Sequence, residues 1–301
     1  EALVVGKMKP SILSAGTKYQ IGGLPNHKVE EHLVTLKAIV GRSMTNGGAI
    51  VKLVDIKGFF DSESLKGVMN SLHEAKIPKK AYRVWYLTNS QTSVSVKTPA
   101  GQTEFREAGE LCGQGSAGAA LASQLDIDLG VNSYFKSSRD EIKYGSVRIQ
   151  PQEFQDDILH AVPNVSSARI SNIKLSMALR ERLLRCHPTK TCYLVFGNND
   201  YKRKVKEELD NFPLMFGDFE MKEKQSDIYL GDVIHAGGLA ASVVKGMMYE
   251  AAAILTDFRM QAVGGMAGAW DMWELYCRLV YSCPDSTPLP ALRAEAGLWS
   301  M

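Results

Sequence analysis

The most constraining feature of the sequence is a run of mostly apolar residues from Ala49 to Ile56. The run contains only two charged side chains, Lys52 near its middle and Asp55 near its end. A short apolar run bounded by Gly58 is typical of a strand buried inside a sheet. An aspartate at the end of such a strand lies where a core gives way to solvent, so Asp55 is a candidate functional residue.

Apolar periodicity and turn residues predict the other elements. We expect helices at 28–40, 62–72, 78–87, 115–129 and 173–185, and strands at 92–98, 144–149, 154–162 and 191–196. After Tyr229 the sequence again has helical periodicity. This order favours an antiparallel sheet with helices on one face, which is an α+β architecture.

Composition narrows the class of protein. The 301 residues are 45% hydrophobic and 23% charged, as in ordinary globular domains. A net charge of +2 neither favours nor excludes a basic nucleic-acid groove. No signal sequence opens the chain and no apolar run could span a bilayer, so we expect no membrane partner. The first residue is Glu1, and we interpret the sequence as a fragment.

The five cysteines indicate the compartment. Their number is odd and none forms a close C-x-x-C pair, which argues against a disulfide framework and against structural zinc. The sequence therefore predicts an intracellular protein, in nucleus or cytoplasm, that is not secreted.

Two acidic sites carry the candidate chemistry. Asp55 ends the buried run, and the adjacent pair Asp156 and Asp157 follows Phe154 and Gln155. Neighbouring carboxylates repel one another and raise each other's pKa unless a cation neutralises them. Carboxylate oxygens suit Mg²⁺, which completes its coordination with water and substrate phosphates. The plainer alternative is a strand-end acid and a solvated turn.

Six segments resemble, in order, motifs of reverse transcriptases of the non-LTR retrotransposon type. They are Gln20–Pro25, Asp55–Ser62 (motif A), Gln114–Ser116 (motif B), Phe154–Asp157 (motif C), Lys190 (motif D) and Tyr229–Gly231. The similarity covers roughly Tyr19 to Ser242. Gly113 and Gln155 depart from the residues usual in motifs B and C.

The resemblance implies catalytic and metal-binding roles. Asp55 and Asp156 would bind two Mg²⁺ ions, or Mn²⁺, with Asp157 as a supporting acid and the Ile56 carbonyl as a further ligand. Lys190 would donate a proton to the departing pyrophosphate or neutralise it. A lone lysine is more often a solvated surface residue, so the role of Lys190 depends on the resemblance.

The resemblance also implies substrate-binding roles. Phe60 would act as a steric gate that occupies the space of a ribose 2′-hydroxyl, although a core aromatic is the alternative. Gln114 and Gly115 would let the backbone approach the nascent base pair, since glycine has no Cβ. An ordinary helix start is the alternative for this segment.

The implied fold is a right-hand polymerase palm. Residues 1–48 would be partial fingers, and residues 49–242 the palm with a fingers hairpin at about 88–108. A helical thumb-like region would cover 243–283, and residues 284–301 have no clear periodicity.

The implied function is RNA-directed DNA polymerase activity, with an RNA template, a DNA primer and deoxynucleoside triphosphates as partners. Only a short leader precedes Tyr19 where basic fingers strands belong, so we expect weak or absent synthesis. The first alternative is a non-catalytic nucleic-acid-binding module with a palm scaffold. The second is an RNA-templated RNA polymerase.

Overall fold

A computed structural model describes residues 2–239, apart from positions 18, 23, 25–26, 46, 91–92, 96, 100, 108–117, 139–140 and 145–146. The chain divides into two compact units, Glu1–Gln225 and Ser226–Met301. The predicted thumb-like region 243–283, the tail 284–301 and the predicted motif B residues Gln114 and Gly115 lie outside the described residues.

The first unit contains the helices of the described chain. They are α1 (Ala2–Ala15), α2 (Val29–Thr45), α3 (Phe59–Ser62), α4 (Leu65–Glu74), α5 (Lys79–Asn89), α6 (Ala119–Phe135), α7 (Val165–Arg180) and α8 (Asn199–Asn211). None of these described helices is both long enough and apolar enough to cross a membrane.

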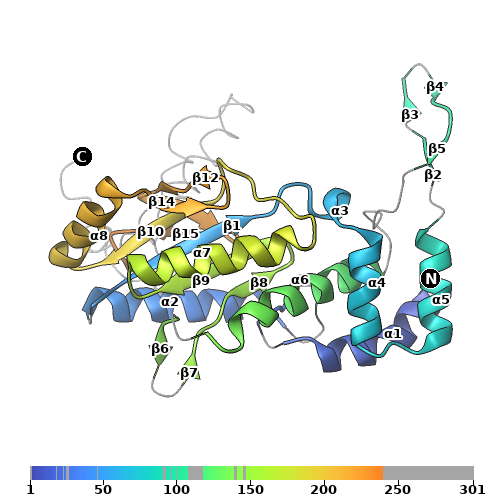
Figure 1. Ribbon diagram of the computed structural model, residues 1–301, viewed down its shortest axis with the longest axis horizontal. Coiled ribbons are helices and arrows are strands. Elements are labelled where there is room, and N and C mark those ends of the chain that lie inside the picture. Colours follow the sequence, from blue (N-terminus) through green and yellow to red (C-terminus); the bar gives the residue numbers. More distant parts are fainter. Residues whose placement is uncertain are drawn as a thin grey trace, which may run out of the picture. The chain divides into compact units, whose positions relative to one another are not determined.

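The centre of this unit is a five-stranded sheet in the order β13-β10-β1-β9-β8 (Figure 1). Its strands are β1 (Gly48–Asp55), β8 (Gln152–Phe154), β9 (Asp157–Val162), β10 (Cys192–Gly197) and β13 (Lys222–Glu223). Neighbouring strands run antiparallel except β13, which is parallel to β10. The sheet is therefore mixed, where the sequence predicted an antiparallel one.

β1 is the central strand, as its apolar sequence predicted. Its neighbours on the two sides are β9 and β10, so Ile50 lies opposite both Val162 and Val195. All six residues from Ala49 to Val54 are buried. A strand with partners on both edges satisfies its backbone hydrogen bonds without water, which permits this burial.

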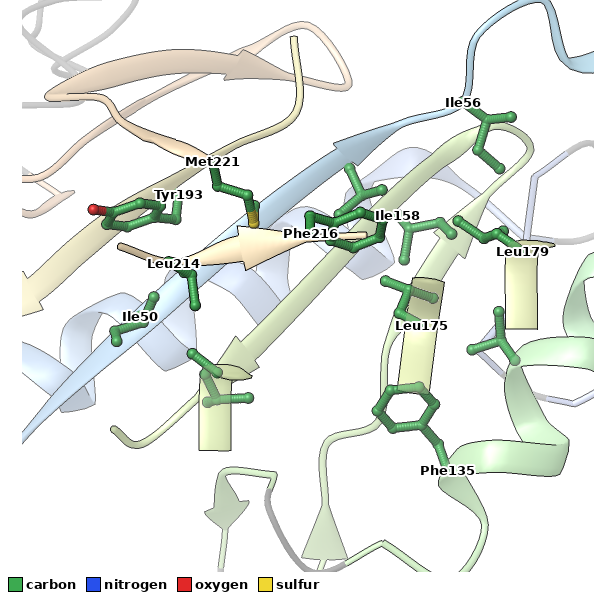
Figure 2. Close-up of a cluster of buried hydrophobic side chains, with 14 of the residues drawn as sticks. Ile50, Ile56, Phe135, Ile158, Leu175, Leu179, Tyr193, Leu214, Phe216 and Met221 are labelled. Carbon is green, nitrogen blue, oxygen red and sulfur yellow. The ribbon is translucent and has the colours of Figure 1, made fainter. Parts of the chain in front are cut away.

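Alternate residues of the central strands pack on α6, α7 and α8. Figure 2 shows Ile50 of β1, Ile56 directly after it and Ile158 of β9 clustered with Leu175 and Leu179 of α7. Fully burying such a side chain contributes about 1.5–3 kcal/mol. The cluster also includes Phe135, Tyr193, Leu214, Phe216 and Met221.

Helices cover both faces of the sheet, whereas the sequence predicted helices on one face. α2 contacts β1 and β10 on the face opposite α7 (Figure 1). Residues Leu36, Ile39 and Val40 of α2 are buried. A second apolar core joins α1, α4, α5 and α6 around Leu72 and Trp85.

The remaining strands form short antiparallel pairs. Strand β2 (Ser93–Val94) pairs with β5 (Arg106–Glu107), and β3 (Lys97–Thr98) pairs with β4 (Gly101–Gln102). These two pairs lie in the predicted fingers hairpin. The other pairs are β6 (Lys143–Tyr144) with β7 (Val147–Arg148), and β11 (Met215–Phe216) with β12 (Phe219–Glu220).

The described part of the second unit is a hairpin of β14 (Ser226–Tyr229) and β15 (Asp232–His235). Leu230 and Gly231 form its turn with φ values of 50° and 84°. The prediction that the chain becomes helical directly after Tyr229 is therefore wrong, because this turn reverses the chain into a second strand.

Three boundaries of the first unit also differ from the predictions. The strand expected at 154–162 is a hairpin whose turn, Gln155–Asp156, separates β8 from β9. Helix α7 starts eight residues earlier than expected because the Asn164 side chain caps it by accepting from Ser167 N. Ser64, not Ser62, occupies the N-cap position of α4.

Candidate active site

The carboxylates predicted from sequence come together where β1 and β9 adjoin. Asp55, the last residue of β1, is the Cα partner of Asp157, the first residue of β9. One residue further on, Ile56 N donates a hydrogen bond to Asp156 O at 3.3 Å. Segments about a hundred residues apart in sequence are thus held side by side by backbone pairing.

The adjacent aspartates are positioned by a tight turn. Phe154 and Asp157 are the paired residues that close the β8–β9 hairpin, and Gln155 and Asp156 form its two-residue loop. Gln155 has a φ of 58°, a left-handed conformation that is uncommon for a residue with a Cβ. The turn therefore holds Asp156 at the tip and Asp157 on the strand.

Lys190 supplies the positive charge at this site. Its Nζ lies 3.2 Å from Asp55 Oδ2, and its side chain is 63% exposed while that of Asp55 is 23% exposed. Backbone hydrogen bonds dock the preceding loop onto β1, because His187 N donates to Asp55 O at 2.9 Å. The loop then enters β10, so Lys190 lies just before the strand on the other side of β1 from β9.

The carboxyl groups influence one another electrostatically. Burial, together with the charges of Asp156 and Asp55, raises the pKa of Asp157 to about 6, although the Lys190 charge acts in the opposite direction. Burial also raises the pKa of Asp156, again with a contribution from Asp55. Such repulsion between like charges is relieved by a bound cation.

These residues fit a divalent cation whose coordination is completed from outside the chain. Among the residues that the structure describes, no three His, Cys, Asp or Glu side chains form a ready-made metal-binding group. The Lys190 ammonium nevertheless lies beside Asp55, which shows that this carboxylate attracts a positive charge. Mg²⁺ commonly takes one or two protein carboxylates together with water and phosphate oxygens, which matches this partial set.

The two remaining described candidates lie directly after β1. Ile56 is 2% exposed and forms an isolated bridge with Cys186. Phe60 is half-buried in α3 and its ring lies 4.9 Å from that of Phe59, centroid to centroid. Gly58 precedes α3 with a φ of 55°, so glycine permits the sharp change of direction between β1 and α3.

One contact of Asp55 was not predicted from sequence. Thr191 Oγ1 accepts a hydrogen bond from Asp55 N at 3.3 Å. This hydroxyl ties the residue after Lys190 to the end of β1. The sequence offers only the adjacency of Thr191 to Lys190 as a signal.

Comparison with known proteins shows the fold. No protein-family model matches the sequence, and no curated protein matches it. The structure is similar to apo telomerase from Candida tropicalis truncated from the C-terminal domain, with a TM-score of 0.53 and 10% identity. It is also similar to apo telomerase from Candida tropicalis, with a TM-score of 0.54 and 11% identity.

Each match covers 78% of this chain, and respectively 44% and 39% of the telomerase chain. The chain thus spans less than half the length of the telomerases that it matches. At such low identity the likeness concerns the fold alone. The fold is α+β and polymerase-like, with a mixed five-stranded sheet and packed helices that resemble a polymerase palm.

Proposed function

We propose that this chain carries the palm of an RNA-directed DNA polymerase of the non-LTR retrotransposon type. The observation that carries the proposal is the pairing of Asp55 with Asp157 at adjoining strand ends, with Lys190 against Asp55. The polymerase-like fold supports it, because it brings these residues together from three separate strands and loops. The partners would be an RNA template, a DNA primer and deoxynucleoside triphosphates.

Metal binding is the first part of the proposal. Asp55 and Asp156 would hold two Mg²⁺ ions, or Mn²⁺, with Asp157 as a supporting acid and the Ile56 carbonyl as a further ligand. The chemistry that two bound ions supply is activation of the primer 3′-hydroxyl and stabilisation of the leaving pyrophosphate. The raised pKa of Asp157 supports this assignment, because burial and the neighbouring charges of Asp156 and Asp55 both disfavour its carboxylate form, and a bound cation would offset them.

Lys190 would act on the leaving group. Its ammonium is exposed and attached to Asp55 by a single ion pair, which is weak at a solvated surface. A nucleotide triphosphate entering the site would compete for this ammonium. Nζ would then donate a proton to the departing pyrophosphate, or neutralise it.

Phe60 would select the sugar. Its ring follows β1 by five residues and packs on Phe59, so the Gly58 turn and the apolar core both restrict its position. An apolar ring beside the sugar would exclude a 2′-hydroxyl and accept a deoxyribose. Gln114 and Gly115 would contact the template and the incoming base.

The test is primer extension on an RNA template with Mg²⁺ and deoxynucleotides. Asp156→Ala should reduce extension by more than about 100-fold, since losing even a group that orients a metal ligand costs about 10- to 100-fold. Asp200→Ala is the matched control, because Asp200 is an exposed acid of α8 whose partner is Arg203. It should extend primers as the wild type does.

Primer extension, together with a measurement of primer–template binding, also tests the two alternative functions. Binding of the primer–template without extension, in wild type and Asp156→Ala alike, would replace the polymerase with a non-catalytic nucleic-acid-binding module. Incorporation of ribonucleotides in preference to deoxynucleotides would replace it with an RNA-templated RNA polymerase.

A further inference from the structure

The segment Tyr19–Gly22 lies along the edge of the central sheet, beside the hairpin that carries Asp156 and Asp157. Glu153 N donates to Tyr19 O at 2.9 Å, and Ile21 N donates to Glu153 O at 3.1 Å. Gln20 and Glu153 form a parallel β-bridge. The segment thus follows β8 as far as the start of the turn.

The side chain of Gln20 reaches the turn itself. Gln20 is 3% exposed, and its Oε1 accepts hydrogen bonds from Gly22 N at 3.0 Å and from Gln155 N at 3.2 Å. Gln155 is the residue with the left-handed backbone, directly before Asp156. The amide oxygen of Gln20 therefore fixes the N–H of the residue that sets the direction of the turn.

Gly22 allows the close approach that this contact requires. A Cβ at Gly22 would lie 2.6 Å from Gln155 N and 2.9 Å from Gln155 Cγ. Both distances are too short for real atoms. Any side chain at this position would push the turn away from the segment.

His32 of α2 contacts both the Tyr19–Gly22 segment and the β8–β9 hairpin. Its ring makes a hydrogen bond with the Tyr19 backbone. The ring also packs edge-on against Phe154, with centroids 6.4 Å apart and an interplanar angle of 74°. Phe154 is the residue that pairs with Asp157 to close the hairpin.

We infer that Gln20, Gly22 and His32 form a brace that positions the Gln155–Asp156 turn, and so the carboxylates, for metal binding. The inference rests on the proposed function, which makes Asp156 and Asp157 metal ligands. These three are positioning residues, because they act through the turn and reach no substrate. The brace links the chain before β1 to a turn about 135 residues later.

Two variants remove the brace by different means. Gln20→Met keeps a side chain of similar length but leaves the Gly22 and Gln155 N–H groups without their acceptor. Gly22→Ala keeps every hydrogen-bonding group and introduces the clash with Gln155. Each should weaken Mn²⁺ binding by about 10- to 100-fold and raise the Mg²⁺ concentration for half-maximal primer extension to a similar degree.

Each variant has a matched control. Gln152→Met makes the same exchange at a buried glutamine of β8, whose Oε1 accepts no hydrogen bond from the described residues. Gly6→Ala adds a Cβ in α1 where nothing lies within 4 Å. Both controls should keep the wild-type Mn²⁺ affinity, measured by electron paramagnetic resonance on folded protein.

The measurements distinguish positioning from stability. If the brace variants melt at lower temperature but retain the wild-type Mn²⁺ affinity and Mg²⁺ dependence, the brace inference is overturned. A wild type that binds Mn²⁺ without extending primers would remove the polymerase assignment, and the Mn²⁺ affinities of the variants would still decide the brace. A wild type that binds no Mn²⁺ would overturn both.

Discussion

Two charged residues of β1, Lys52 and Asp55, lie three positions apart and occupy contrasting environments. Lys52 is fully buried, and its Nζ donates to Ser171 Oγ and, at 3.0 Å, to Asn172 Oδ1 of α7. Asp55 is at the strand end, partly exposed and paired with the exposed ammonium of Lys190. The Lys52 ammonium is held by buried neighbours, whereas the Asp55 carboxylate is partly open to solvent.

The contrast shows that one strand can carry a residue that stabilises the fold and a residue of the candidate active site. Lys52 faces α7, and its hydrogen bonds to Ser171 and Asn172 attach that helix to the centre of β1. Asp55 belongs to a group of carboxyls that repel one another. Burial lowers the pKa of Lys52 and raises the pKa of Asp157, because it penalises the charged form of each group.

The larger expected effect concerns Lys52. Burial lowers the pKa of Lys52 to about 7, with the Glu141 charge opposing the change. The unfolded state therefore binds more protons between about pH 7 and the ordinary lysine pKa, so the free energy of unfolding should rise with pH in that window. Lys52→Met should lose this rise and be less stable than wild type at pH 9, by about 1–3 kcal/mol, because two buried oxygens lose a donor.

Urea unfolding at pH 7 and pH 9 measures this difference. Primer extension by Lys52→Met under conditions where the protein is folded should equal that of wild type. If Lys52→Met unfolds as wild type does at pH 9 but loses primer extension, Lys52 would have a role in the reaction and not in stability.

The smaller expected effect concerns Asp157 in metal-free protein. Its pKa of about 6 is above the ordinary value for aspartate, so the folded state binds the proton more tightly. The stability contributed by this group is present at low pH and is lost as pH rises from about 4 to 6. Asp157→Asn should flatten that dependence, with a change below about 1 kcal/mol because the site is partly solvated.

Thermal unfolding in a chelator at several pH values between 4 and 7 checks this prediction. A loss of stability in Asp157→Asn above pH 6 would mean that the carboxylate makes a favourable contact, contrary to the repulsion inferred at the site.

Local sequence predicted the central strand well. The run from Ala49 to Ile56 predicted a buried strand, and β1 lies at the centre of the sheet. The start of α7 was missed although Pro163 and Asn164 give a local signal for it, since an asparagine cap needs no long-range contact. Attention to apolar spacing alone placed that helix too late.

The hairpin was harder to predict from local pattern. Gln155 adopts a positive φ without being glycine or asparagine, so turn propensity gives no warning of it. The parallel partner of β10 is another example, because β13 contributes only two residues to the sheet. Such pairings depend on how distant segments pack.

The candidate active site could likewise be predicted only in part from the sequence. The identity of the acids came from their order along the chain and the resemblance of their motifs, whereas their pairing through Asp55 and Asp157 required the structure. The buried contacts of Lys52 and the reach of Gln20 to Gln155 join residues more than a hundred positions apart. No periodicity within a segment encodes contacts of that kind.

The most direct measurement is Mn²⁺ binding by the full chain, followed by electron paramagnetic resonance. Asp55→Asn should weaken binding by more than about tenfold, because a neutral amide replaces a carboxylate ligand. Lys52→Met should bind as wild type does. Equal Mn²⁺ affinity in wild type and Asp55→Asn would contradict the claim that the acids at the ends of β1 and β9 share a divalent cation.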